Sequence, residues 1–400
     1  MKTNSAVSLA VMMLLEYFIW GSWYVTMGTY MDENLHSSGL QIGAAYSALA
    51  IATMISPFFI GMVADRFFAA QRIMGVLHLL GGVLLFLATK ITGNTAFYWM
   101  ILLYSLLYMP TIALSNSVAF HQMSDPGRQF PWIRVFGTLG WIVAGLIIGK
   151  LKLEKTASTF HLAAAASIGL AVLSIVLPST PPKGKAEGAS ASKALGTDAF
   201  VLFRDKPYLI FFIAAILVCV PLSFYYGFAN LFLNELRLPE AASKMTLGQG
   251  SEAIFILAIP FLFNRIGVKN MLLMGMTAWT LRYLCFAYGN TGPNEWMLYA
   301  GIILHGVCYD FFFVTGYMYT EKKAGEKIKN AAQGLFTFAT YGVGMFIGTW
   351  FSGIIVDRYK LPGELHNWTG IWYVPAIIAI AVLVYFILFF REKRSLKPAG

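Results

Sequence analysis

A few ionisable side chains lie within the apolar stretches of this 400-residue chain, and their types and positions point to chemistry inside a membrane. A charge held at bilayer depth is costly, and such residues usually mark the path of a substrate or an ion. Three of them, Arg134, Glu252 and Asp310, lie in segments whose other polar residues repeat at helical spacing. The others are Glu16, His78, Arg282 and His305. The pattern predicts a polar site between helices and favours solute transport.

One apolar segment carries Arg134, Thr138 and Trp141 at spacing i, i+4, i+7, so all three share a helix face. Arginine offers a rigid fork of donors, threonine a hydroxyl and tryptophan a flat apolar surface. Together they suit a ligand that has hydroxyl groups and an aromatic ring. The alternative is that Arg134 is an ordinary arginine near the cytoplasmic end of its helix, with its charged head at the interface.

A second segment contains Gln249, Gly250, Ser251 and Glu252, followed by an unbroken apolar run to Phe263. Gln249 and Glu252 lie at i, i+3 and share a face. A carboxylate at this depth must be paired, hydrated by a cavity, or protonated. We therefore predict that Gln249 and Glu252 face a substrate cavity.

A third segment contains His305 and Tyr309 at i, i+4, with Asp310 turned about 100° from Tyr309 on the helix. Asp310 is followed by three phenylalanines, so its acid group lies in an apolar setting. We predict that Asp310 binds a proton and that its charge responds to the substrate or to a partner cation. The alternative is a fixed ion pair with Arg282, although a pair that breaks during a transport cycle would serve both roles.

Two further helices present polar and aromatic residues on one face. These are Ser223, Tyr226 and Asn230 in the seventh span, and Glu16, Trp20 and Trp23 in the first. Glu16 has no obvious cation partner, and His78 and His161 are expected to be core histidines with satisfied hydrogen bonds. The chain offers no zinc-ligand spacing, no phosphate-binding glycine loop and no nucleophile with a base. We therefore expect no catalytic residues, no metal, no cofactor and no ATP-driven pump.

Composition predicts a membrane protein. Hydrophobic residues make up 58% of the chain and charged residues 12%, against about 25% charged residues in soluble domains. The apolar stretches are about 18–26 residues long, enough for a helix to cross about 30 Å of hydrocarbon. Apolar residues continue past Glu16 without a clear cleavage site, so we expect a first membrane helix rather than a signal peptide. The sequence predicts an all-α polytopic membrane protein.

Charge placement predicts the topology. Twelve spans fit the apolar stretches, at residues 6–31, 42–63, 73–93, 97–120, 131–149, 158–178, 208–233, 245–263, 269–288, 296–319, 331–355 and 370–390. With both termini inside, the internal segments hold about 19 Lys and Arg and the external loops about 8, which satisfies the positive-inside rule. We therefore expect both termini in the cytoplasm. The net charge of +10 gives no reason to expect a nucleic-acid partner.

A long polar interruption divides the spans six and six. It covers 179–207, includes Pro181 and Pro182, and has the composition of a solvated linker. The predicted organisation is an N-terminal six-helix bundle at 1–178, a cytoplasmic linker at 179–207, and a C-terminal six-helix bundle with a short basic tail at 208–400. Two pseudo-symmetric bundles joined by a basic loop match the plan of the major facilitator superfamily, whose halves rock around a midplane site.

Short motifs extend over almost the full length of the chain. They are Trp20-Gly21-Ser22-Trp23, Tyr108-Met109-Pro110-Thr111, Ile133-Arg134 leading to Gly137-Thr138, Asp198-Ala199-Phe200, Gln249-x-Ser251-Glu252, Leu281-Arg282, Phe286-Ala287-Tyr288-Gly289 and Asp310-Phe311-Phe312. Together these motifs resemble those of the bacterial nucleoside:proton symporters, the nucleoside permeases of the major facilitator superfamily. The resemblance implies a nucleoside pocket between the two bundles and transport coupled to protons.

The resemblance also implies roles for single residues. The polar positions of the family's nucleoside pocket are matched by Arg134, Thr138, Gln249, Glu252 and Asp310. Trp141 and Tyr309 take the places of aromatic residues near the base.

The chain departs from the enteric members of that family at four positions. Ser223 and Tyr226 stand where those members have Gln and Asn. His305 and Phe313 stand where a Tyr and an Asn are expected. These changes leave the ribose-binding and charged positions intact but alter side chains that could discriminate bases, so the substrate class is better supported than the substrate itself.

The leading hypothesis is a monomeric, proton-coupled nucleoside importer of the bacterial inner membrane that works by alternating access. Its predicted substrate-binding residues are Arg134, Thr138, Trp141, Ser223, Tyr226, Gln249, Glu252, His305, Tyr309 and Asp310, and its predicted proton-coupling residues are Asp310 first and Glu252 second. One rival is a transporter of a sugar or another small polar solute in the same fold. A second rival is a non-transporting membrane sensor, which gives no reason for buried carboxylates opposite Arg134.

Overall fold

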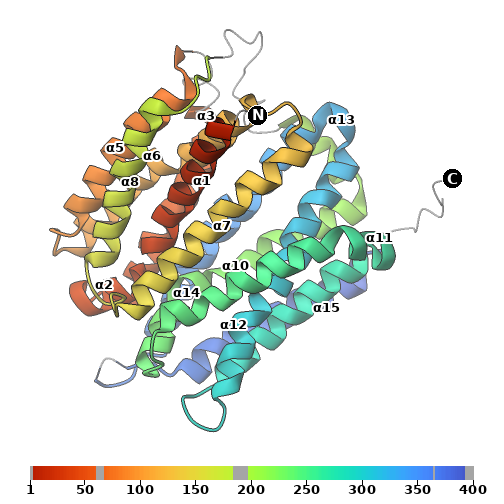
Figure 1. The fold of residues 1–400 in the computed structure, drawn as a ribbon. Coiled ribbons are helices and arrows are strands. Elements are labelled where there is room, and N and C mark those ends of the chain that lie inside the picture. Colours follow the sequence, from red (N-terminus) through yellow and green to blue (C-terminus); the bar gives the residue numbers. More distant parts are fainter. Residues whose placement is uncertain (1–2, 60–66, 183–196, 364, 392–400) are drawn as a thin grey trace.

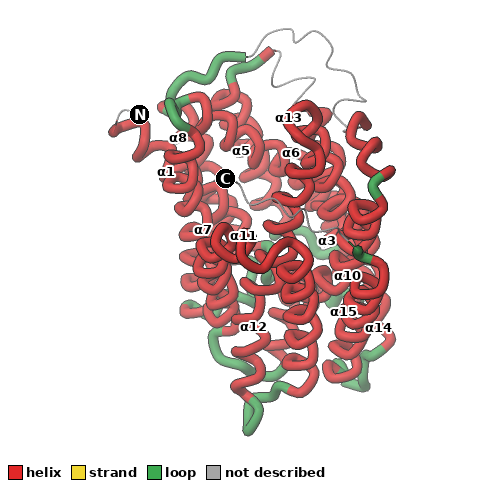
Figure 2. The backbone as a smooth tube through the Cα atoms, turned by 90° about the vertical axis from the view of Figure 1, so that its right-hand side faces the viewer, coloured by secondary structure: helices red, strands yellow, loops and turns green. Residues whose placement is uncertain are grey.

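The computed structural model describes residues 3–59, 67–182, 197–363 and 365–391. The described chain is almost entirely helical, with short loops between the helices (Figure 2). The middle of the predicted linker at 179–207 lies outside the described residues. Its last part forms a short 3-10 helix, η2 (Thr197–Arg204), so the end of the linker is ordered rather than fully extended.

The earlier helices form one side of the molecule (red to yellow-green in Figure 1). They are α1 (Thr3–Trp23), α2 (Met27–Leu35), α3 (Gly39–Phe59), α5 (Ala70–Ala88), α6 (Asn94–His121), α7 (Pro126–Lys150) and α8 (Ser158–Val176). The predicted first span is two helices in the structure, because the chain turns at residues 24–26 between α1 and α2. These two helices together make one crossing.

The later helices form the other side (green to blue in Figure 1). They are α10 (Lys206–Glu235), α11 (Ala241–Tyr288), α12 (Glu295–Tyr309), η3 (Asp310–Val314), α13 (Thr315–Thr337), η4 (Phe338–Gly344), α14 (Met345–Arg358) and α15 (Trp368–Phe389). Gly267 (φ 76°) breaks α11 into two spans, and Gly325 (φ 64°) breaks α13. Glycine adopts this left-handed backbone without steric cost. η3 and η4 are π-helical turns within the tenth and eleventh spans.

The helices fit twelve membrane crossings. Nine stretches of the described residues are long and apolar enough to span a bilayer. One of them, Glu295–Arg358, holds two spans on either side of Gly325, and α11 supplies two more around Gly267. The prediction of an all-α polytopic protein with twelve spans is confirmed.

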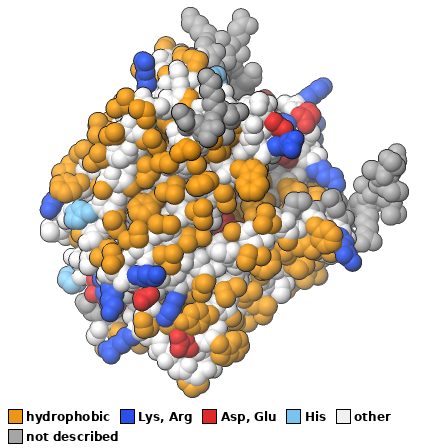
Figure 3. All heavy atoms as spheres, viewed as in Figure 1, with side chains coloured by type: hydrophobic (Ala, Val, Ile, Leu, Met, Phe, Trp, Pro, Cys, Tyr) orange, Lys and Arg blue, Asp and Glu red, His pale blue; other side chains and the backbone are white. Residues whose placement is uncertain are grey.

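Large apolar side chains cover much of the outer surface. On α5, Val76, Leu79, Leu80 and Val83 are exposed at the spacing of one helix face. On the side seen in Figure 3, apolar side chains fill the middle and charged side chains gather toward the edges. Water would drive such a surface to associate, whereas lipid tails solvate it.

The two sides of the molecule meet closely at the end where α3 begins. There α3 packs against α14, and α7 packs against α11. A Cβ atom added at Gly43 would lie 2.2 Å from the carbonyl oxygen of Thr349, so glycine is needed for this approach of two backbones. The hydroxyl of Thr29 on α2 donates a hydrogen bond of 2.6 Å to the side-chain oxygen of Asn230 on α10. Together these contacts close this end of the molecule.

Two carboxylates fasten the same end. Asp357, at the end of α14, accepts hydrogen bonds from the backbone N–H groups of Gly39 (2.6 Å) and Leu40 (2.9 Å) at the start of α3. Glu154, in the loop after α7, accepts one from the N–H of Ala242 (2.5 Å) at the start of α11. Each carboxylate caps a helix of the opposite side, where the helix dipole favours negative charge. Burial raises the pKa of Glu154, and the Ala242 hydrogen bond offsets part of that shift.

We predict that Asp357→Ala loosens the closed end. Loss of a helix cap costs about 0.5–2 kcal/mol, which changes the ratio of closed to open molecules several-fold. Spin labels are placed at the exposed positions Glu33 and Leu361 in a background without cysteines. Double electron–electron resonance then measures the distance between the labels, and so the separation of the two sides of the molecule. The variant should gain a component at longer distance. Glu326→Gln is the matched control, because the Glu326–Lys329 ion pair lies within one side. Identical distance distributions in all three proteins would contradict the role of this cap.

Candidate functional site

A cavity of about 610 Å³ lies between the two sides of the molecule. Helices α1, α3, α6 and α7 contribute to its wall from one side, and α10, α11, α12 and the segment from α13 to α14 contribute from the other. Its lining includes seven of the predicted substrate-binding residues: Arg134, Thr138, Trp141, Tyr226, Gln249, Glu252 and Tyr309. These residues come from the fifth, seventh, eighth and tenth spans, so the fold brings together segments that are far apart in the sequence.

Charged groups of opposite sign enter the cavity from opposite sides. The guanidinium carbon of Arg134 on α7 lies 4.0 Å from the ring centre of Tyr17 on α1, a cation–π contact that keeps the guanidinium at the cavity wall. The alternative in which Arg134 reaches to the headgroups is therefore wrong. The Glu252 side chain on α11 is 28% exposed, and it lines the same cavity.

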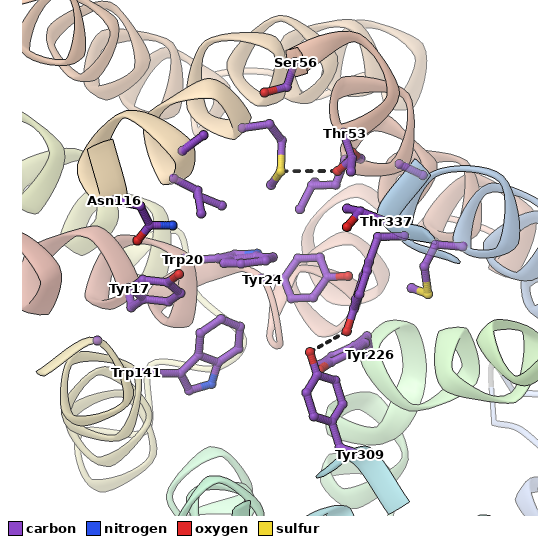
Figure 4. Close-up of a pocket in the computed structure, with 18 of the residues that line it drawn as sticks. Tyr17, Trp20, Tyr24, Thr53, Ser56, Asn116, Trp141, Tyr226, Tyr309 and Thr337 are labelled. Atoms are coloured by element: carbon purple, nitrogen blue, oxygen red, sulfur yellow. Dashed lines mark hydrogen bonds between the residues drawn. The ribbon is translucent and has the colours of Figure 1, made fainter. Parts of the chain in front are cut away.

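Aromatic rings form much of the remaining wall. Figure 4 shows Trp20, Tyr24 and Trp141 on one part of the cavity wall and Tyr226 and Tyr309 on another. The Trp20 and Trp141 rings meet edge to face with centres 5.4 Å apart. Such flat apolar surfaces are suited to stacking on a planar ring, while the polar groups nearby are suited to hydroxyls.

The cavity extends from the middle of the molecule toward the C-terminal ends of α3 and α6. Its lining there includes Ser56, Pro57 and Asn116. In the opposite direction the rings of Tyr24 and Tyr226 meet across the two sides, with centres 5.3 Å apart, and the glycine contacts of α3 and α14 lie beyond them. The cavity is therefore closed at one end of the molecule and continues toward the other.

Three predicted residues do not line this cavity. The first is Ser223, which shares a helix with Tyr226. Its side chain is buried, and its hydroxyl donates a hydrogen bond of 2.7 Å to the carbonyl oxygen of Val220 in the same helix. A serine in a helix often satisfies its hydroxyl in this way, and here it leaves no group for a ligand.

The second is His305, which is buried behind the cavity wall. Its Nδ1 lies 2.9 Å from a terminal nitrogen of Arg282, and its Nε2 lies 3.9 Å from the Glu252 carboxylate. The alternative ion pair between Asp310 and Arg282 is therefore wrong for this structure. Arg282 instead contacts His305 and lies over the ring of Tyr225, with its guanidinium carbon 3.5 Å from the ring centre.

The third is Asp310, which follows the cavity-lining residue Tyr309 and turns away by about 100°. Its side chain is 0% exposed, and neither carboxylate oxygen has a hydrogen-bond partner among the described residues. It opens the π-helical turn η3, which packs against α11. π-Helical turns are rare and are frequently found at functional sites. The expectation that Asp310 faces the same cavity as Glu252 is not met.

Glu16, for which no partner was predicted, forms a buried pair with His78. The two side chains are 0% and 1% exposed, and Oε2 of Glu16 lies 2.9 Å from Nε2 of His78. Ser167 donates its hydroxyl hydrogen to the carbonyl oxygen of His78 (2.9 Å), so its oxygen accepts from Nδ1–H of His78 (3.1 Å). One further proton then occupies the Glu16–His78 hydrogen bond. The pair is neutral wherever that proton sits.

Sequence reasoning missed several residues of the wall. Tyr17 on α1 and Tyr24 in the turn after it lie on either side of Trp20 in the sequence, and Tyr341 lies on the π-helical turn η4. The hydroxyls of Tyr309 and Tyr341 are hydrogen-bonded to each other. A cluster of tyrosines in the first, seventh, tenth and eleventh spans was a signal in the sequence, but helical aromatic residues more often pack than bind.

Comparison with known proteins now decides the family. Residues 1–395 match the family model described as Nucleoside H+ symporter. The chain is 41% identical to the putative nucleoside transporter YegT of Escherichia coli (strain K12), over 98% of this chain and 95% of that protein. It is 38% identical to the xanthosine permease of the same organism, over 96% of each. The chain belongs to the nucleoside H+ symporter family.

A solved structure agrees with this assignment. The crystal structure of the nucleoside transporter NupG has a TM-score of 0.90 to this chain at 33% identity, covering 98% of this chain and 100% of that one. The chain is thus a multi-pass membrane transporter with the major facilitator fold, and not an enzyme. As a member of this family it couples nucleoside import to protons by alternating access.

The geometry predicts different effects for two residues of one helix. Tyr226→Ala removes a ring from the cavity wall, and loss of one stacking partner should weaken uridine uptake about tenfold, since base stacking is worth about 1–3 kcal/mol. Ser223→Ala should change uptake less than about twofold, because its hydroxyl bonds only within its own helix. Initial rates of labelled uridine uptake, normalised to protein in the membrane, measure both. A large loss in Ser223→Ala together with a small one in Tyr226→Ala would contradict this placement.

Proposed function

We propose that the cavity is the nucleoside site and that both halves of the protein bind the ligand together. The supporting observation is that Arg134 and Thr138 from one half and Gln249 and Glu252 from the other line one space of about 610 Å³. Pockets for small molecules measure roughly 300–1,000 Å³ and combine apolar walls with a few convergent polar groups. This cavity meets that description.

Each group has a chemical part in binding. The Glu252 carboxylate accepts hydrogen bonds from ribose hydroxyls, and Gln249, one turn away, both donates and accepts. Arg134 and Thr138 donate to the ligand from the opposite half. Trp141 and its neighbouring rings contact the base, which explains why so much of the wall is aromatic. A sugar can also pack against an aromatic ring, but a planar base uses more of this flat surface, so the wall favours nucleosides over sugars.

Asp310 is the proposed proton carrier, with Glu252 second. An ionised carboxylate with no hydrogen-bond partner in an apolar environment costs several kcal/mol by order of magnitude, and a bound proton removes that cost. Asp310 has no such partner among the described residues. It adjoins Tyr309 in the cavity wall and begins a π-helical turn, so a change in its charge acts directly on the wall that contacts the substrate.

The orientation in the membrane follows from charge. Both termini lie in the cytoplasm by the positive-inside rule, and the protein is a monomer in the bacterial inner membrane. The C-terminal ends of α3 and α6 then lie on the cytoplasmic side, and the helix caps formed by Asp357 and Glu154 lie on the outer side of the membrane. In this orientation the structure is the inward-facing form, closed to the outside.

The function is tested by uptake of labelled uridine in cells that express the chain. We expect uptake above the background of cells without it and a loss of accumulation when a protonophore collapses the proton gradient. Unlabelled nucleosides should compete, and ribose and disaccharides should not. If only sugars competed with uridine, the protein would instead be assigned as a sugar transporter of the same fold. Absence of counterflow in proteoliposomes would favour the sensor.

Asp310→Asn tests the proton carrier. The variant keeps the shape of the side chain but cannot exchange a proton, so uridine counterflow should persist while accumulation driven by a pH gradient is lost. Glu321→Gln, an acid exposed on α13, is the matched control and should accumulate like wild type. Gradient-driven accumulation at the wild-type level in Asp310→Asn would remove Asp310 from the coupling step.

A further inference from the structure

We propose that His305 is a positioning residue that holds Glu252 for the substrate, an inference that rests on the role proposed for Glu252. His305 was expected to touch the ligand, but it lies behind the cavity wall with 1% of its side chain exposed. Its two ring nitrogens point to two charged groups. Nδ1 lies 2.9 Å from Arg282, and Nε2 lies 3.9 Å from the Glu252 carboxylate.

The contact with Arg282 fixes the proton on the imidazole. A guanidinium has donors and no acceptor, so Nδ1 of His305 accepts the hydrogen bond and carries no hydrogen. The neutral ring then has its hydrogen on Nε2, the nitrogen that faces Glu252. His305 therefore presents an N–H to the carboxylate and cannot itself accept a ribose hydroxyl through that atom.

Contacts between the backbones of α11 and α12 keep Glu252 and His305 next to each other. The hydroxyl of Ser251, the residue before Glu252, accepts a hydrogen bond of 3.0 Å from the backbone N–H of Gly306, the residue after His305. A Cβ atom added at Gly306 would lie 2.5 Å from the backbone nitrogen of Glu252, so α11 and α12 cross here in direct contact. This crossing leaves His305 and Glu252 little freedom to move apart.

The chain of contacts links a buried cation to the substrate site. Arg282 is 0% exposed, and among the described residues no carboxylate contacts its guanidinium. The order Arg282, His305, Glu252 places a neutral ring between a positive and a negative group, with the N–H dipole directed at the anion. At 3.9 Å this N–H is too far from the carboxylate for a hydrogen bond, but its dipole attracts the Glu252 carboxylate toward His305.

Other groups that face the pair come from every neighbouring element. They are Arg134 on α7, Tyr17 on α1, Tyr225 and Tyr226 on α10, Tyr309 on α12 and Asp310 on η3. Of these groups, Arg134 carries the positive charge. It lies across the cavity from Glu252, so the ligand binds between Arg134 and Glu252. His305 therefore supplies the donor on the side of Glu252 that the ligand does not reach.

Two substitutions distinguish the role of Nδ1 of His305 from the role of Nε2. In His305→Asn the short amide can accept from Arg282 but does not reach Glu252. In His305→Gln the longer amide reaches the Nε2 position and can donate to Glu252. We expect the KM for uridine to rise about threefold in His305→Asn, because Glu252 loses the N–H dipole that faces its carboxylate from 3.9 Å, with a smaller change in kcat. His305→Gln should restore most of the wild-type KM.

A pH profile of uridine counterflow gives the second readout. His305→Asn should shift the pH dependence, because Glu252 loses its donor, and His305→Gln should keep the wild-type profile. His161→Gln is the control, since that histidine contacts Thr89 away from the cavity. A wild-type KM and pH profile in His305→Asn, or equal defects in the Asn and Gln variants, would overturn the inference.

Glu252→Gln, measured in parallel, separates this inference from the proposed function. If Glu252→Gln raises the KM and His305→Asn does not, Glu252 binds the substrate without help from His305, and the inference alone is wrong. If Glu252→Gln leaves the KM unchanged, the proposed role of Glu252 is wrong, and the inference is overturned with it.

Discussion

The cost of holding charge within hydrocarbon governs the interior of this transporter. A buried ion must find a partner, a wet cavity or a proton, and the structure uses all three. Glu16 is paired with His78, and the pair shares a proton. Arg282 is buried against His305 and an aromatic ring. None of these groups lines the cavity, which leaves Glu252 in the cavity and Asp310 beside its wall as the acids proposed to change charge.

The remaining charged groups gather where the two halves meet. Arg134 and Glu252 face one cavity, so a polar ligand can satisfy both and draw the halves together. Asp310 lies one residue from the wall and has no hydrogen-bond partner among the described residues. The proposed site and the proposed coupling group thus share a stretch of the tenth span that includes a π-helical turn. A turn of this kind gives the helix an extra residue to redistribute when the wall moves.

The sequence predicted the membrane spans well because length and hydropathy determine them. It also predicted the cavity face of α7, since Arg134, Thr138 and Trp141 obey simple helical spacing. It failed at Ser223 and His305, whose partners are set by local backbone and by a residue on another helix. Helical spacing identifies a shared face, but tertiary packing decides which neighbour that face meets.

Asp310 and Glu16 are two further residues whose neighbours could not be predicted from helical spacing. Helical spacing places Asp310 about 100° from Tyr309, but it does not predict that Asp310 opens a π-helical turn packed against α11 instead of facing the cavity. For Glu16 the missing partner was His78, about sixty positions away, and the pairing became visible only in the fold, where a hydrogen bond of 2.9 Å joins α1 to α5. Contacts between distant segments are what single-sequence reasoning lacks.

The neutral Glu16–His78 pair has an electrical consequence. Moving one elementary charge through the membrane potential changes the free energy by about 2.3 kcal/mol per 100 mV. A pair without net charge contributes little to that work when its bundle moves as a unit, because its two opposite charges then move through nearly the same potential difference. Current measured during turnover therefore reports on the proposed site and on the proton that Asp310 is proposed to carry, rather than on the acid buried in the first span.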